Sequence, residues 1–126
     1  MYPEASLNQK FLDEGLNIKV RFTKNSLNDL KGFQKEIQKR ILSLIFAQGL
    51  KGPLLKPDGI GAPLHPPLNG FAKIKSKSIN IRVIYRPVTN SDYIIMEIIA
   101  IGPRDRKLVY KIAAERKLEF LREMNK

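Results

Sequence analysis

The residues of this chain best suited to chemistry are concentrated in one stretch, FAKIKSKSINIRVIYR, at positions 71–86. Five of its sixteen side chains are cationic: Lys73, Lys75, Lys77, Arg82 and Arg86. Ammonium and guanidinium groups bind phosphate oxygens, and a guanidinium can do so through two parallel hydrogen bonds. The stretch therefore indicates a surface that binds a polyanion.

Alternation separates these charges from the apolar residues along two predicted strands, 71–77 and 79–88. The three lysines share one face of the first strand, and on the second strand Arg82 and Arg86 face away from the neighbouring isoleucine, valine and tyrosine. If the apolar residues line the core, the cations meet on the other face as a groove. A merely solvated sheet face gives the same pattern, so alternation alone does not decide between binding and solvation.

Two further residues, in the segment IGPRDRKLVY, are candidates for the same site. Arg104 stands at the corner between a predicted strand and a C-terminal helix, and Tyr110 follows about two helical turns later. A cation at a helix start opposes the helix dipole, a small cost that suggests a function for Arg104. For Tyr110, packing of the ring on the sheet is as compatible with the sequence as a catalytic role.

The composition agrees with a polyanion-binding domain of moderate size. The chain has 126 residues, with 23 Lys plus Arg against 12 Asp plus Glu, and a formal net charge of +11. This length fits one domain. The charge attracts polyanions, so the candidate partners are RNA, DNA, ribosomes, anionic lipid and acidic protein segments.

The scarcity of two residue types narrows the chemistry. The sequence has no cysteine and a single histidine, His65. Disulfides, thiolate metal sites and cysteine nucleophiles are therefore excluded. A Ser-His-Asp triad or a multi-histidine metal cluster would lack partners. We expect neither a metal nor another cofactor.

The cellular location is predicted from the same sequence features. Residues 1–16 contain no apolar run of signal-peptide type, and no window approaches the length of a membrane span. The absence of cysteine suits a reducing compartment. We expect a cytoplasmic protein with no membrane partner.

The elements that must position the site are indicated by periodicity. Residues 1–16 are weakly patterned and predict an N-terminal arm, docked or forming a short helix, before a single domain at 17–126. The text NIKVRF alternates as a half-buried strand. Apolar residues at spacings of three and four in residues 24–49 then predict a helical hairpin.

Glycine, proline and serine mark the predicted boundaries. Ser26 suits an N-cap, Gly32 a break between two helices, and Gly49 a helix stop. Residues 50–70 hold five of the eight prolines and are predicted to be a loop. So long a loop in a compact domain is unusual, and it is either functional or evidence against the assignment.

After the loop, strands are predicted at 71–77, 79–88 and 93–101, and a helix is predicted from Pro103. The last strand, YIIMEIIAI, is apolar enough to be buried on both faces. The order β-α-α-β-β-β-α predicts an α+β fold in which an antiparallel sheet packs against the N-terminal helical hairpin, with helices on one side and a C-terminal helix.

Together these motifs resemble the RelE branch of the RelE/ParE superfamily of toxins. The resemblance covers residues 17–117 and lies in the order and spacing of NIKVRF, the hairpin, KIK, RVIYR and IxxIGPRDRxxVY. Members of this branch use two lysines one residue apart, an arginine before V-I-Y, an arginine after the I-G corner and a tyrosine six residues later. The matching positions, which the resemblance implies are catalytic, are Lys73, Lys75, Arg82, Arg104 and Tyr110.

The resemblance implies a type II toxin that inhibits translation. Such a protein is a ribosome-dependent, metal-independent endoribonuclease that cleaves mRNA in the ribosomal A site. It is held inactive by a cognate antitoxin, expected to be acidic and partly disordered when free. Two alternatives remain: a ParE-like toxin that inhibits DNA gyrase, whose relatives generally lack this residue set, and a non-catalytic module that binds RNA or the ribosome.

Cleavage of RNA without metal requires the 2′-hydroxyl to attack the adjacent phosphorus, with a base, charge stabilisation and an acid. Tyr110 is the first candidate base, because neighbouring cations favour a phenolate. Lys73 or Lys75 is the alternative, and the other lysine with Arg82 would then hold the phosphate. Arg104 is expected to stabilise the leaving oxygen. The expected products are a 2′,3′-cyclic phosphate and a 5′-hydroxyl.

Overall fold

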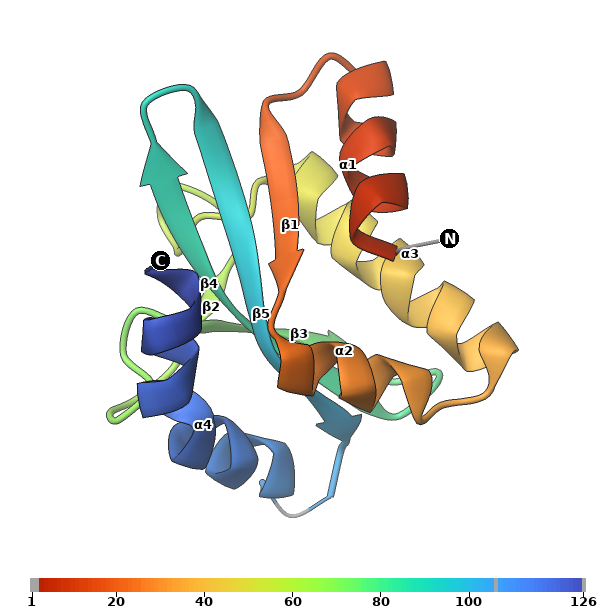
Figure 1. Ribbon diagram of the computed structural model, residues 1–126, viewed down its shortest axis with the longest axis vertical. Coiled ribbons are helices and arrows are strands. Elements are labelled where there is room, and N and C mark those ends of the chain that lie inside the picture. The colour runs from red at the N-terminus through yellow and green to blue at the C-terminus, as the bar shows by residue number, and fades with distance from the viewer. Residues whose placement is uncertain (1–2, 106, 126) are drawn as a thin grey trace.

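A five-stranded sheet forms the centre of the part that the structure, a computed structural model, describes: residues 3–105 and 107–125 (Figure 1). Its strands lie in the order β1-β5-β4-β3-β2. The elements, in chain order, are α1 (Pro3–Asp13), β1 (Ile18–Phe22), α2 (Lys24–Lys31), α3 (Lys35–Lys51), β2 (Ala62–Pro63), β3 (Ala72–Ser76), β4 (Ile81–Asn90), β5 (Tyr93–Pro103) and α4 (Leu108–Met124).

The predicted α+β class and the order of the main elements are confirmed, with α1 and the two-residue β2 in addition. The prediction of an antiparallel sheet is wrong for one strand pair. β1 runs parallel to β5, from Ile18 opposite Ile94 to Phe22 opposite Ile98. Parallel neighbours require a long connection. The chain between these two strands supplies one, since it passes through two helices and three strands.

Helices cover both faces of the sheet, not one face as predicted (Figure 1). On the side of α1 and α3 the core includes Phe11, Ile41 and Met96. On the side of α4 it includes Ile84 and Phe120. The run YIIMEIIAI requires this arrangement, because a strand that is apolar on both faces must be covered on both.

A bulge in β5 shapes the face that α4 covers. The register shifts so that Ile84 lies opposite Ala100 while Tyr85 lies opposite Ile98, which leaves Ile99 as the extra residue. Ile99 and Ala100 are both buried in the core beneath α4. Bulges increase local twist, and this one adds apolar surface on which α4 packs.

Most of the predicted N-terminal arm is α1, a helix that docks on β1. Phe11 is fully buried. Asn8 Oδ1 accepts a hydrogen bond from the Val20 N–H at 2.7 Å, and Glu4 Oε1 accepts one from the Phe22 N–H at 2.8 Å. β1 is an edge strand, so these bonds satisfy backbone donors that would otherwise be open to another chain.

The predicted helical hairpin is α2 and α3, and Gly32 ends α2 as expected. The N-cap of α2 is Thr23 and not Ser26: Thr23 Oγ1 accepts a hydrogen bond from the Ser26 N–H at 3.0 Å. α3 does not stop at Gly49. It continues to Lys51 and is capped by Gly52, whose φ of 117° favours glycine.

Gly49 instead allows α3 to approach α1 closely. A Cβ at this position would overlap the buried ring of Phe11. Overpacking of this kind costs about 1–3 kcal/mol, whereas alanine gains at most about 1 kcal/mol in helix propensity. We expect Gly49→Ala to lower the free energy of unfolding measured in urea. An increase in stability would show that the Phe11 ring moves aside at no cost.

Helix α4 begins at Leu108 and not at Pro103 as predicted. Pro103 is the last residue of β5, where it lies opposite Ile81. The Arg104 N–H then donates to the Asn80 carbonyl at 2.8 Å, which continues the strand pairing past the proline. Arg104 therefore lies at a strand end, and the argument from the helix dipole does not apply to it.

Candidate functional site

Strands β3 and β4 position three of the five predicted site residues on the face beneath α4. In their antiparallel register Lys75 lies directly opposite Arg82, and Lys73 lies opposite Ile84. Alternate residues share a face, so the three cations are neighbours. Like charges directly opposite each other destabilise a sheet, and an anion bound between them would remove that repulsion.

Tyr110 meets Arg82 from the first turn of α4. The Arg82 Nη1 donates a hydrogen bond to the Tyr110 hydroxyl oxygen at 2.6 Å. The guanidinium carbon lies 5.3 Å from the centroid of the tyrosine ring. Because α4 starts at Leu108, Tyr110 lies one turn into the helix and not two. Its hydroxyl is thus held among the cations of the sheet.

The charges of the site act on Lys75. Its pKa is lowered below the ordinary lysine value, chiefly by the positive charge of Lys73 and next by that of Arg82. Arg104 contributes to the same lowering, which places this exposed residue within electrostatic range of Lys75. A lowered pKa increases the neutral fraction of the amine, the form that can accept a proton.

The structure thus gathers all five predicted residues around one surface, although they come from four parts of the chain. Lys73 and Lys75 lie on β3, Arg82 on β4, Arg104 at the end of β5 and Tyr110 on α4. Hydrogen bonding joins Arg82 to Tyr110, and charge repulsion links Lys75 to the other three cations. The arrangement combines phosphate-binding cations with two groups that can exchange protons.

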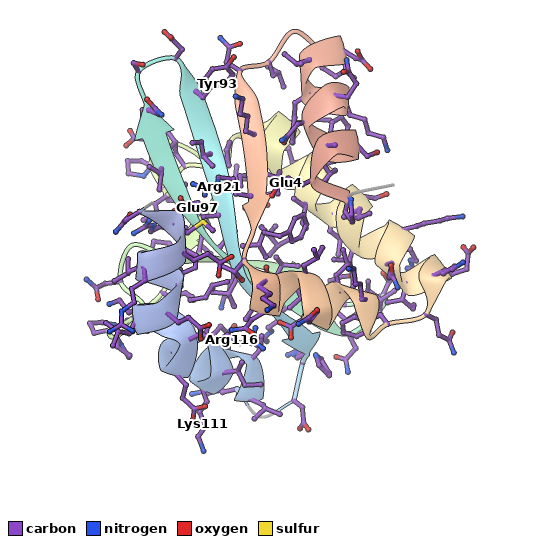
Figure 2. All side chains as sticks on the ribbon, viewed as in Figure 1. Glu4, Arg21, Tyr93, Glu97, Lys111 and Arg116 are labelled. Atoms are coloured by element: carbon purple, nitrogen blue, oxygen red, sulfur yellow. The ribbon has the colours of Figure 1, made fainter. Side chains whose placement is uncertain are left out.

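A pocket of about 560 Å³ opens beside these residues. Its walls are the end of the 50–70 loop, strands β3 and β4, and the start of α4. The lining residues are Leu64, His65, Pro66, Pro67, Leu68, Lys73, Arg82, Lys107, Tyr110, Lys111 and Ala114. At the outer end of the molecule Lys111 projects away from α4 (Figure 2). Because Lys73, Arg82 and Tyr110 belong to the lining, the pocket is continuous with the predicted site.

Arg82 has one donor that nothing in the described residues satisfies. Its Nε is buried and has no hydrogen-bond partner there, while its Nη1 is bound to Tyr110. A buried donor without an acceptor costs about 1–3 kcal/mol. The Arg82 side chain also lines the pocket described above, so an anion in that pocket can contact the guanidinium.

Arg86, predicted to share the cationic groove, belongs to a different cluster. Its Nη2 lies 2.7 Å and its Nε 2.8 Å from the Glu97 Oε1, a carboxylate that is almost fully buried. Arg21 approaches the same carboxylate at 3.8 Å, and Figure 2 shows Arg21 and Glu97 together over the middle of the sheet. Arg86 is therefore neutralised within the fold and is not open to a ligand.

Sequence reasoning missed the residues that complete the pocket. His65, to which the sequence assigned no role, is exposed but borders the pocket, as do Lys107 and Lys111. The segment 50–70 was predicted as a loop, and it is one apart from residues 50–51, which end α3, and the two residues of β2. Its unusual length was the available signal, because long loops in compact domains are often functional.

Two further features bear on the expected chemistry. Within residues 3–105 and 107–125, no group of three or more His, Cys, Asp or Glu side chains has the geometry to hold a metal ion. No helix in the same part of the chain is long and apolar enough to cross a bilayer.

This chain is similar to known proteins in structure but not in sequence. No protein-family model matches the sequence, and no curated protein sequence matches it. A mutant of the E. coli toxin RelE in the free state is 18% identical with a TM-score of 0.58, covering 77% of this chain and 94% of that chain. The toxin–antitoxin complex RelBE2 from Mycobacterium tuberculosis contains a similar chain, 22% identical with a TM-score of 0.55, covering 71% and 95%.

A third similar structure is the YoeB/ParE toxin from Agrobacterium tumefaciens, which is 21% identical with a TM-score of 0.53, covering 68% of this chain and 97% of that one. Nearly the whole of each of these proteins is matched, whereas part of the present chain lies outside the common region. The chain has the fold of the RelE and YoeB/ParE toxins.

Proposed function

We propose that this protein is the toxin of a type II toxin–antitoxin pair and that it cleaves mRNA in the ribosomal A site. The observation that carries the proposal is the meeting of Lys73, Lys75, Arg82 and Tyr110 beneath α4 in a fold of the RelE type. Arg82 supports it further, because its guanidinium can bind a phosphate and its side chain lines the adjoining pocket.

The proposed reaction is a transesterification within the RNA. A base removes the proton of the 2′-hydroxyl, and the 2′-oxygen bonds to the adjacent phosphorus. The bond from phosphorus to the 5′-oxygen breaks, and that oxygen takes up a proton. Lys73 and Arg82 stabilise the extra negative charge, Arg104 the leaving oxygen. The products are a 2′,3′-cyclic phosphate and a 5′-hydroxyl, and DNA, which has no 2′-hydroxyl, is inert.

Lys75 and Tyr110 are the two candidate bases. The lowered pKa of Lys75 favours its amine, since a larger fraction is neutral near physiological pH. The Tyr110 hydroxyl oxygen accepts a hydrogen bond from Arg82, which holds it within the cationic site. The two candidates must be separated by variants.

The pH dependence of cleavage tests Lys75 as the base. The rate should rise with pH and level off above the pKa of Lys75, which lies below the ordinary value of 10.5 because Lys73 and Arg82 repel its charged form. Loss of general base catalysis typically costs about 100- to 10,000-fold. We expect Lys75→Gln to reduce the rate of single-turnover cleavage by this factor and to abolish its rise with pH. If Tyr110→Phe alone abolishes the rise, Tyr110 is the base.

The site has few groups suited to acid–base catalysis, so we expect a partner to contribute to the rate. Positioning of the reactants can contribute about 7–11 kcal/mol, and the ribosomal A site is proposed to supply it by holding the message.

A protein that cleaves the messages of its own cell must be inhibited when it is not needed. We propose a cognate antitoxin that is acidic and partly disordered when free, consistent with the +11 charge of the chain.

Induction in a bacterium tests the function directly. We expect growth arrest, and new 5′ ends on a translated message that are absent from the same message without its start codon. Equal cleavage of both messages would contradict ribosome dependence. Growth arrest without RNA cleavage, accompanied by inhibited supercoiling by purified gyrase, would support the ParE-like alternative.

Tyr110→Phe provides a second test in the same assay. The change removes only the hydroxyl oxygen that accepts the Arg82 hydrogen bond. If this hydroxyl acts in the reaction, cleavage and growth arrest decline while binding to ribosomes, measured by co-sedimentation, is retained. Unchanged toxicity of the folded variant would contradict a role for the phenol and favour an action by binding alone.

A further inference from the structure

The pocket beside the cationic residues is larger than a phosphate requires. Its volume is about 560 Å³, within the range of about 300–1,000 Å³ that is typical of sites for small organic ligands. Lys73 and Arg82, proposed to hold the phosphate, form part of its lining. The pocket thus extends from the phosphate-binding cations toward the loop and α4.

Much of the rest of the lining is apolar. Five of the eleven lining residues are Leu64, Pro66, Pro67, Leu68 and Ala114, and the ring of Tyr110 also borders the pocket. A phosphate or ribose gains little from such a surface. An unstacked nucleobase gains more, because proteins that recognise single-stranded RNA bind splayed bases against aromatic and other flat side chains.

The wall is held in place by bonds of its own. Leu64 N–H donates to the Phe71 carbonyl at 3.1 Å, and Leu68 N–H donates to the His65 carbonyl at 2.9 Å. The Lys117 ammonium on α4 donates to the Pro67 carbonyl at 2.7 Å. The pocket is therefore formed before a ligand arrives, which lowers the cost of ordering on binding.

We propose that this pocket is a nucleobase subsite: it receives the unstacked base of a nucleotide that flanks the scissile phosphate. The proposal rests on the proposed RNA cleavage and adds a role for the proline-rich loop. The phosphate of that nucleotide contacts Lys73 and Arg82, and its base lies between residues 64–68 and the first turns of α4. The loop thereby contributes substrate contacts that the cationic residues cannot make.

Binding of mononucleotides tests the subsite without cleavage. Isotope-labelled protein is titrated with adenosine 3′-monophosphate and, as the baseless control, ribose 5-phosphate. Both compounds should shift the amide signals of Lys73 and Arg82. Only the nucleotide should shift the His65 ring and Ala114 methyl signals, and it should bind about tenfold more tightly, as one stacked base allows. Equal affinities with no shift at His65 or Ala114 would overturn the proposal.

A pair of matched variants locates the effect. Ala114→Leu adds bulk to the pocket wall, and Ala5→Leu adds the same bulk to α1, on the opposite side of the sheet. We expect Ala114→Leu to remove the tenfold preference for the nucleotide and Ala5→Leu to retain it. Retention in the folded Ala114→Leu protein would contradict the subsite. If Ala114→Leu does not fold, the wild-type comparison decides alone.

The cleavage assay distinguishes a failure of the subsite from a failure of the proposed RNA cleavage on which it rests. If the protein cuts a message during translation but binds the nucleotide and ribose phosphate equally, the proposed function stands and the subsite is wrong. A protein that prefers the nucleotide but cuts no message retains the pocket as a base-binding site, and the proposed cleavage is then wrong.

Discussion

Arg82→Ala is expected to reduce cleavage of translated mRNA by about 100- to 1,000-fold, the usual cost of removing one preorganised donor from a site where negative charge develops. Arg82 lies opposite Lys75 on the neighbouring strand and contacts Tyr110 at 2.6 Å. Its removal deletes a phosphate ligand and also the bond that holds the phenol.

The stability of the same variant should change little. Arg82 has a buried Nε without a partner in the described residues, and removal of an unsatisfied donor relieves a cost. Urea denaturation beside single-turnover cleavage measures both effects. Arg82→Lys is the matched control: it retains the charge but not the bidentate geometry, so we expect intermediate activity. Full activity with a large loss of stability would show that Arg82 is structural.

The clustering of the basic residues could be predicted from the sequence because the governing pattern is local. Lys73 and Lys75 are separated by one residue on β3, and a short turn leads to Arg82, so alternation and hairpin pairing alone put them on one face. Tyr110 and Arg104 were harder, since they depend on where α4 packs. Their assignment came from resemblance to the RelE branch and not from periodicity.

The features that the sequence did not predict depend on contacts between distant segments. The parallel direction of β1 is set by its pairing with β5, and the position of α4 is set by the buried surface around the bulge at Ile99. The pocket wall at residues 64–68 has no periodic pattern at all. Its place next to Arg82 follows from tertiary bonds such as the one from Lys117 to Pro67.

Arg86 shows where local alternation fails to predict function. It shares its face of β4 with Arg82 and has the same side chain, so the sequence does not distinguish the two. The difference lies on the neighbouring strand. Arg86 is opposite Glu97, whereas Arg82 is opposite Gly102, which offers no side-chain partner. A pairing partner thus neutralises one arginine and leaves the other available to a ligand.

Arg86→Ala should therefore have the opposite effect to Arg82→Ala: a large loss of stability with the chemistry of the site unchanged. Glu97 is 3% exposed, and removal of its main partner leaves a buried carboxylate that, among the described residues, only Arg21 approaches as an ion-pair partner, at 3.8 Å. Breaking a buried pair in this way typically costs about 3–5 kcal/mol. Urea denaturation measures the loss, and cleavage by the fraction that remains folded should be normal.

The double variant Arg86→Met/Glu97→Met tests this explanation. When both charges are replaced by apolar side chains of similar size, no buried charge is left unpaired, and stability is usually restored or increased. We expect the double variant to unfold at a higher urea concentration than Arg86→Ala and to cleave RNA normally. If it is as unstable as Arg86→Ala, then Arg86 stabilises the fold through packing, such as its contact with the Phe120 ring at 5.0 Å, and not by neutralising Glu97.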